Sequence, residues 1–226
     1  MEDSQVNGEN FMDIVGRRRS MREFKPDPVP REVIEAVFAG AQRAPSNCNT
    51  QPWFVHVVTG DTLESLRGEL PVKFAAGEIA LDFPYDGQYE GVYKERQYAS
   101  ASALYDCLGI AREQKAERNQ WFMRNFSFFD APAAAFFTLP TGCGLREACD
   151  LGMFAQTVML GLTAFGLGSC PQTALAFLAN VIRPALRLGE HEQLMFGMSF
   201  GYPTDGAVNQ VQTDRASLDQ VVTFHN

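Results

Sequence analysis

The stretch Leu151-Gly-Met-Phe-Ala-Gln-Thr-Val-Met-Leu-Gly-Leu-Thr-Ala-Phe-Gly166 decides the fold of this chain of 226 residues. From Leu151 to Ile182 there is no Asp, Glu, Lys, Arg or His. A helix that is apolar on every face has to be hidden on all sides, either in lipid or inside protein. Gln156, Thr157 and Thr163 interrupt the apolar surface, and no cluster of Lys or Arg and no Trp or Tyr marks the ends. We therefore predict a buried central helix at a subunit interface, and not a membrane span.

The composition is that of a globular protein, with 46% hydrophobic and 20% charged residues. No internal repeat or linker interrupts it, so we predict one domain over residues 1–226, with a polar, disordered start over residues 1–10 that is neither a secretory signal nor a transit peptide. The net charge of -8 argues against nucleic-acid and anionic-membrane binding. The five cysteines lack CxxC spacing and the three histidines lie far apart, which supports neither a disulfide framework nor a metal site. A reduced, cytoplasmic protein is the simplest interpretation.

Apolar spacing and turn residues predict the other elements. The expected helices are Phe11–Arg19 with Asn10 as its cap, Pro30–Ala44, one opening at Gly60, one from Glu95 to Glu117, and Thr173–Ile182. The expected strands are Trp53–Thr59, Ala133–Leu139, Leu194–Phe200 and Val221–Phe224. Short strands scattered between helices indicate an α+β fold with a modest sheet.

The basic residues of this acidic chain are concentrated at Arg17-Arg18-Arg19-Ser20-Met21-Arg22. Arginines beside a hydroxyl provide the fixed positive charge and planar donors that a phosphate needs. A solvated surface turn is the commoner explanation of such a run, so the cluster by itself is weak evidence.

Two further stretches have the composition of binding loops. Ala44-Pro-Ser-Asn-Cys-Asn-Thr-Gln-Pro-Trp53 carries amide side chains that can read the edge of a heteroaromatic ring, or form an ordinary Asn/Ser turn. Gly166-Leu-Gly-Ser-Cys-Pro-Gln-Thr173 has glycines that allow backbone to approach a flat ligand, or a helix C-cap followed by proline.

In this order, the three stretches resemble the FMN-dependent nitroreductase family. The resemblance runs through Arg18-Arg19-Ser20-x-Arg22, the Ala44-Pro-Ser-x-x-Asn-x-Gln-Pro-Trp53 loop, the Gly-rich central helix, Gly168-Ser-Cys-Pro-Gln172 and Gly201-Tyr-Pro203. It implies a three-layer α+β fold with a small, mostly antiparallel sheet surrounded by helices. It also implies an intertwined homodimer with two FMN sites at the interface.

The resemblance assigns site residues by motif. Arg18, Arg19, Ser20 and Arg22 would serve the FMN phosphate, ribityl chain and pyrimidine edge, and Arg215 the phosphate from the tail, where Gln210 and Gln212 replace the basic residues usual in the family. Pro45, Ser46 and Asn47 would reach the flavin from the other subunit, and Asn49 and Gln51 would hydrogen-bond its ring system. Backbone of Gly168, Ser169, Cys170, Pro171 and Gln172 would lie near the reactive N5. Residues 205–226, with their last strand, would extend onto the partner subunit.

Aromatic residues between 83 and 129 resemble those of the branch that reduces nitroaromatic compounds, and we expect a lid that stacks on a flat substrate. The alternative is extra core or dimer surface. The expected substrate contacts are Phe83, Tyr85, Tyr89, Tyr93, Trp121 and Phe122.

The resulting hypothesis is a ping-pong oxidoreductase in which NADPH or NADH reduces FMN and a nitro compound is then reduced through nitroso to hydroxylamine. The cofactor carries the chemistry, so no catalytic acid, base or nucleophile is expected, and Cys48 and Cys170 are interpreted as small packing residues. The alternatives are an FMN reductase of the same fold acting on quinones, conjugated alkenes or carbon–halogen bonds, a non-catalytic anion-binding module, and a membrane protein. The sequence has no GxGxxG motif after an expected strand, so we do not expect a separate Rossmann domain.

Overall fold

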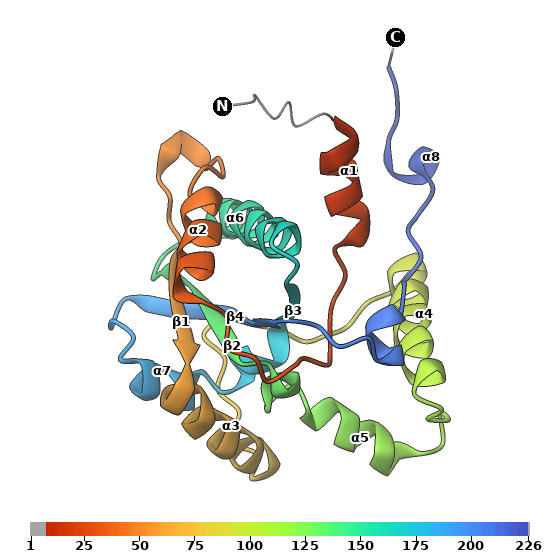
Figure 1. Cartoon of the computed structure of the whole chain (residues 1–226), viewed down its shortest axis with the longest axis horizontal. Helices are drawn as coiled ribbons and strands as arrows, with labels where there is room; N and C mark the ends of the chain where they lie inside the picture. Colours follow the sequence, from red (N-terminus) through yellow and green to blue (C-terminus); the bar gives the residue numbers. More distant parts are fainter. Residues whose placement is uncertain (1–7, 226) are drawn as a thin grey trace.

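The computed structural model describes residues 8–225 and has two helical layers around one sheet (Figure 1). The α-helices are α1 (Gly8–Arg17), α2 (Arg31–Ala41), α3 (Gly60–Ala75), α4 (Gly91–Cys107), α5 (Lys115–Met123), α6 (Leu145–Ala164), α7 (Ala179–Leu186) and α8 (Leu218–Val221). The strands are β1 (Phe54–Thr59), β2 (Ala133–Pro140), β3 (Gly168–Gln172) and β4 (Glu192–Gly201). Short 3-10 helices are η1 (Asn47–Asn49), η2 (Phe128–Asp130), η3 (Thr173–Phe177) and η4 (Ala207–Gln210).

The four strands pair antiparallel in the order β1-β2-β4-β3. Strand β2 is central and buried along nearly its whole length, and its side chains alternate between the two faces. Ala135 and Phe137 face a core with α2 and α6, whereas Ala134 and Phe136 face a core with α3 and α7. This confirms the predicted α+β fold with a small antiparallel sheet between helices.

The expected central helix is α6, although it begins at Leu145, before the uncharged stretch. Leu151, Phe154, Val158 and Leu162 recur at helical spacing and are buried against the sheet. The opposite side is open in the single chain, where Met153 is 41% exposed. The helix is therefore not buried on every side within one chain. None of the described helices is both long and apolar enough to cross a bilayer.

Several boundaries differ from the sequence predictions. The helix predicted from Glu95 to Glu117 is two helices, α4 and α5, because Gly109 takes φ +67° in the turn between them. Helix α1 begins at Gly8, so Asn10 lies inside it and does not cap it. The predicted disorder of residues 1–7 lies outside the described residues.

The second half of the uncharged stretch also differs. Residues Gly168–Gln172 form the edge strand β3, where a turn or helix cap was expected. The helix predicted from Thr173 to Ile182 is a 3-10 turn, η3, followed by α7. In the tail, residues Leu218–Val221 form the short helix α8, so the strand predicted at Val221–Phe224 is not present within this chain.

Candidate functional site

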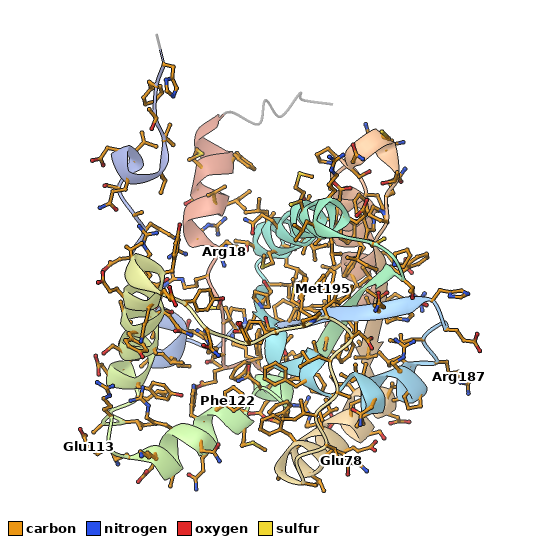
Figure 2. The ribbon with its side chains drawn as sticks, turned by 180° about the vertical axis from the view of Figure 1, so that it is seen from behind. Arg18, Glu78, Glu113, Phe122, Arg187 and Met195 are labelled. Carbon is orange, nitrogen blue, oxygen red and sulfur yellow. The ribbon has the colours of Figure 1, made fainter. Side chains whose placement is uncertain are left out.

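A cavity of about 500 Å³ lies between the end of α1, one face of α4 and the C-terminal segment. Figure 2 shows Arg18 where the chain leaves α1. The cavity is lined by Val15, Gly16, Arg18, Arg19, Ser20, Arg22, Ser100, Leu104, Gln156, Val211, Gln212, Thr213 and Arg215. All four residues of the predicted Arg18–Arg22 motif therefore meet Arg215 at one site, which we call the arginine cavity.

The arginine segment is held against β3 by backbone hydrogen bonds. Ser20 forms a parallel bridge with Ser169, and Met21 N donates to Ser169 O at 2.9 Å. A Cβ at Gly168 would lie 2.5 Å from Met21 Cγ, closer than real Cβ contacts allow. Gly168 is therefore required by the close approach of this segment to β3.

Asn209, a residue that the sequence analysis did not single out, joins the tail to the arginine segment. Its Oδ1 accepts a hydrogen bond from Arg22 N at 2.7 Å, and its Nδ2 donates to Glu23 O at 2.7 Å and to Thr204 O at 3.0 Å. The side chain is 2% exposed, so these bonds satisfy a buried amide. They position the tail residues that follow, up to Arg215, beside the N-terminal arginines.

The positive charge of the arginine cavity is not neutralised by the protein. Among residues 11–225, no carboxylate lies within 4.0 Å of Arg18, Arg19, Arg22 or Arg215, whereas the neighbouring Arg17 pairs with Asp13 at 2.8 Å. Burial, and then the positive charge of Arg215, lowers the pKa of Arg18. Two like charges that converge without a counter-ion are what an anion site requires.

The strand β3 pairs with the arginine segment, and most of its side chains are buried. Gln172 Oε1 accepts from Ser199 N at 3.2 Å and from Ser199 Oγ, and its Nε2 donates to Asn125 O at 2.9 Å. Both ends of the Gln172 amide are therefore hydrogen-bonded within the protein. Burial raises the pKa of the Cys170 thiol to about 11, against the opposite effect of Arg22. The thiol stays protonated at neutral pH, as expected of a packing residue, while Pro171 is exposed.

The polar loop Pro45–Gln51 lies on the other side of α6 from α1 (Figure 1) and lines no part of the arginine cavity. It is attached to α6 because Asn47 N donates to Asp150 Oδ2 at 3.1 Å. Within the loop, Gln51 N donates to Ser46 Oγ at 2.9 Å, and Asn49 and Gln51 take positive φ. A single chain therefore does not bring this loop to the arginines.

The predicted substrate residues fall into three groups. The side chains of Tyr85, Tyr89 and Tyr93 are exposed. Partial burial of the Tyr85 hydroxyl, and then its contact with Tyr89, raises the pKa of Tyr85. Phe83 packs against the core beside α6, and Phe122 against the core beside α3. Trp121 lies under the guanidinium of Arg124, and its buried Nε1 has no described hydrogen-bond partner. None of the six lines the arginine cavity.

The aromatic segment is only partly available for a lid. Phe126, Phe128 and Phe129 are almost completely buried, so this end of the predicted lid region is core. Phe128, Phe129 and Asp130 all take positive φ, which turns the two rings inward.

Sequence reasoning did not assign Gln156, Ser100 or Leu104 to the site. Gln156 carried a signal, because an amide that interrupts an uncharged helix requires a polar neighbour. Ser100 and Leu104 carried no such signal, since the spacing of apolar residues in α4 does not show which face of this helix contacts the tail.

Comparisons with known proteins show the family to which the chain belongs. The Nitroreductase family profile matches residues 15–202. The chain belongs to the nitroreductase family. Nitroreductase NfnB of Mycolicibacterium smegmatis is 42% identical over 213 residues, which cover 93% of this chain and 91% of that protein. The 4-nitrobenzoate reductase of Pseudomonas putida is 33% identical over 210 residues, 92% of each chain.

Solved nitroreductase structures superpose closely on this chain. The FMN-dependent nitroreductase NfnB from Mycobacterium smegmatis in complex with NADPH has a TM-score of 0.93 at 40% identity, covering 97% of this chain and all of that one. The FMN and NADPH-dependent NfnB from sphigopyxis sp. strain HMH has a TM-score of 0.92 at 33% identity, covering 96% of this chain and 99% of that one. The resemblance noted in the sequence therefore identifies the family correctly, and the family match includes the arginine segment and β3 but ends before Arg215.

Proposed function

We propose that this nitroreductase binds FMN in the arginine cavity and uses NADPH or NADH to reduce nitroaromatic compounds in two-electron steps, from nitro through nitroso to hydroxylamine. The proposal rests on one observation, the convergence of four arginines on one cavity: Arg18, Arg19, Arg22 and Arg215. Among residues 11–225, no carboxylate oxygen lies within 4.0 Å of a nitrogen of these guanidinium groups. A site of that charge fits a dianionic phosphate.

The residues present fit the cofactor. Arg18, Arg19 and Arg215 would hold the phosphate, and Ser20 and Arg22 would meet the ribityl chain and the pyrimidine edge. Bound FMN would supply the redox chemistry by accepting hydride from the nicotinamide and passing it to the nitro group. Ser20 and Arg22 would also place hydrogen-bond donors and positive charge at the pyrimidine edge, where they would stabilise negative charge on the bound ring. The protonated, buried Cys170 offers no nucleophile, so the protein positions and stabilises reactants.

The relatives named above support an aromatic nitro compound as substrate, since P. putida 4-nitrobenzoate reductase is among them. The exposed Tyr85, Tyr89 and Tyr93 provide flat, amphipathic surface for such a ring. We assign the substrate contacts to these three tyrosines, together with Phe83, Trp121 and Phe122 as their support.

We further propose a homodimer that completes the site. The exposed side chains Met153 (41%) and Phe165 (51%) of the α6 region need cover, and so does Phe224 in the tail, which is 76% exposed. The loop Pro45–Gln51, remote from the arginines of its own chain, would then reach the flavin of the partner. The tail from residue 205 onward would lie on that partner, and deleting residues 217–226 should weaken the dimer in sedimentation experiments.

The cysteines support a reducing compartment, because the structure gives Cys48, Cys107, Cys143, Cys149 and Cys170 as free thiols. A cytoplasmic enzyme with access to NADPH is consistent with this.

The visible spectrum of the purified protein tests the proposal. We expect a yellow protein whose flavin absorbance is lost on anaerobic addition of NADPH and restored by nitrobenzene. Colourless protein that takes up no FMN, even when FMN is supplied in excess, would overturn the cofactor assignment. Bleaching that nitrobenzene does not reverse, but a quinone does, would overturn the substrate class alone.

A further inference from the structure

A second cavity, of about 700 Å³, lies in the angle between α4 and α5. The two helices join at a turn that contains Glu113, and α5 then runs to Phe122 beside the core (Figure 2). The cavity is lined by Gln97, Tyr98, Ala101, Ser102, Tyr105, Asp106, Ile110, Arg112, Lys115, Arg118, Asn119 and Phe122. We call it the α4–α5 cavity, and the proposed FMN contacts use none of these residues.

Three cations and one carboxylate face the α4–α5 cavity. Arg112, Lys115 and Arg118 form no ion pair within 4.0 Å with any side chain among residues 11–225. The acidic group, Asp106, accepts a hydrogen bond from Ser102 Oγ at 3.1 Å. Lys115 is also the first residue of the nine-residue helix α5, whose N-terminal amides add positive potential. The cavity therefore favours an anion with more than one negative charge.

One cation is fixed in position by an aromatic ring. The guanidinium carbon of Arg118 lies 3.8 Å from the centroid of the Tyr105 ring, and Tyr105 Oη donates to Arg118 O at 3.5 Å. A guanidinium held over a ring face by a cation–π contact still has N–H donors that can bind a planar or tetrahedral anion. Arg118 is the one cation of the three with a described contact to an aromatic ring.

The remaining walls suit a flat heteroaromatic ring. Tyr98 and Phe122 present ring surface, on which a nucleic-acid base can stack. Gln97 and Asn119 carry amides, with both donors and acceptors, for the edge of such a ring. Phosphate-binding cations beside a ring-binding wall are the pattern of a nucleotide site.

Helix α4 separates this cavity from the arginine cavity. Ser100 and Leu104 face the arginines, while the adjacent Ala101 and Tyr105 face the second cavity. The two sets of residues are neighbours on α4, about 100° apart around a helix of roughly 10–12 Å diameter. With FMN bound as proposed, a dinucleotide whose first ring lies on the flavin would have to extend around α4 to place its second ring in the α4–α5 cavity.

We propose that the α4–α5 cavity binds the adenosine 2′-phosphate half of NADPH and so makes the enzyme prefer NADPH to NADH. The 2′-phosphate lies between Arg112, Lys115 and Arg118, and the adenine ring lies on Tyr98 and Phe122. The inference rests on the proposed function for its ligand; its site shares Phe122 with the proposed substrate residues but contains none of the proposed FMN contacts.

Calorimetric titration of the flavin-loaded protein with adenosine 2′-phosphate tests this directly, without turnover. We expect measurable binding that weakens about tenfold or more in Arg118→Gln and in Lys115→Gln, because each removes a charge-assisted contact. Arg96→Gln is the matched control, since Arg96 is an exposed cation of α4 that lines neither cavity. In steady-state assays, KM for NADPH should rise in the two variants while KM for NADH and kcat stay unchanged.

Each other outcome has a defined meaning. Equal binding of adenosine 5′-phosphate and adenosine 2′-phosphate would overturn the assignment to NADPH, as would binding of 4-nitrobenzoate in place of both nucleotides. Unchanged binding in both variants, with the protein yellow and reducible by NADPH, would overturn this inference while leaving the proposed function intact. Protein without flavin would instead contradict the proposed function, and titration of that protein would still test the cavity.

Discussion

Replacing Arg18 by Gln should stabilise the flavin-free protein and weaken its hold on FMN. Without FMN, the Arg18 guanidinium is partly buried beside Arg215, and this environment already lowers its pKa. Removing one of two like charges in a partly solvated site should increase the free energy of unfolding by up to about 0.5 kcal/mol. The repulsion between these two arginines therefore lowers the stability of the flavin-free protein, and a bound anion would remove that cost.

With FMN the sign reverses. A hydrogen bond to a charged group contributes about 1.5–3 kcal/mol, so Arg18→Gln should raise the Kd for FMN by about 10- to 150-fold. At FMN one hundred times its Kd, the ligand stabilises the wild-type protein by about 2.7 kcal/mol. With a Kd raised about 30-fold, the same FMN concentration stabilises the variant by only about 0.9 kcal/mol.

Urea unfolding with and without FMN, and quenching of flavin fluorescence on binding, measure both quantities. Arg96→Gln, an exposed cation outside both cavities, should change neither. If Arg18→Gln destabilised the flavin-free protein by more than about 1 kcal/mol and bound FMN as tightly as the wild type, Arg18 would be a structural residue. The electrostatic reasoning for the cavity would then be wrong.

Three further predictions concern the scaffold and the aromatic surface. Partial burial raises the pKa of Glu192, but hydrogen bonds from His56, Gly189 N and Thr138 outweigh it and hold this pKa below its usual value of 4.5, so Glu192→Gln should cost about 1 kcal/mol in urea unfolding at pH 7. Because the folded pKa is the lower one, this difference from wild type should shrink as the pH falls below about 4.5; a constant difference down to pH 3 would contradict the ionic role. Gly197→Ala, whose Cβ would clash with the buried Leu175 side chain, should lower Tm and cost about 1–3 kcal/mol, whereas Gly68→Ala in open space on α3 should be neutral or stabilising by up to about 1 kcal/mol. Tyr93→Ala, at a side chain 66% exposed, should change kcat/KM among nitroaromatic compounds without changing the rate of flavin reduction by NADPH, and equal losses in both half-reactions would contradict its role in the substrate site.

The family and much of the framework could be predicted from local sequence. The uncharged stretch predicted α6 and the apolar run Ala133–Leu139 predicted the central strand, because periodicity is a property of neighbouring residues. Arg18–Arg22 showed where positive charge is concentrated, but not by itself what it binds. The break between α4 and α5 was missed, because one glycine inside a helical pattern also fits an uninterrupted helix.

The partners of each segment needed the tertiary structure. No local pattern shows that Asn209 hydrogen-bonds to Arg22 N or that Gln172 hydrogen-bonds to Ser199 and Asn125. Nor does it show that the Arg118 guanidinium lies over the Tyr105 ring. These contacts join residues that lie up to 187 positions apart in the chain, as with Arg22 and Asn209. Sequence by itself determined which residues carry charge, rings and amides, since these are covalent properties. Only folding decided which of them face a common cavity, because that depends on how helices and strands pack in space.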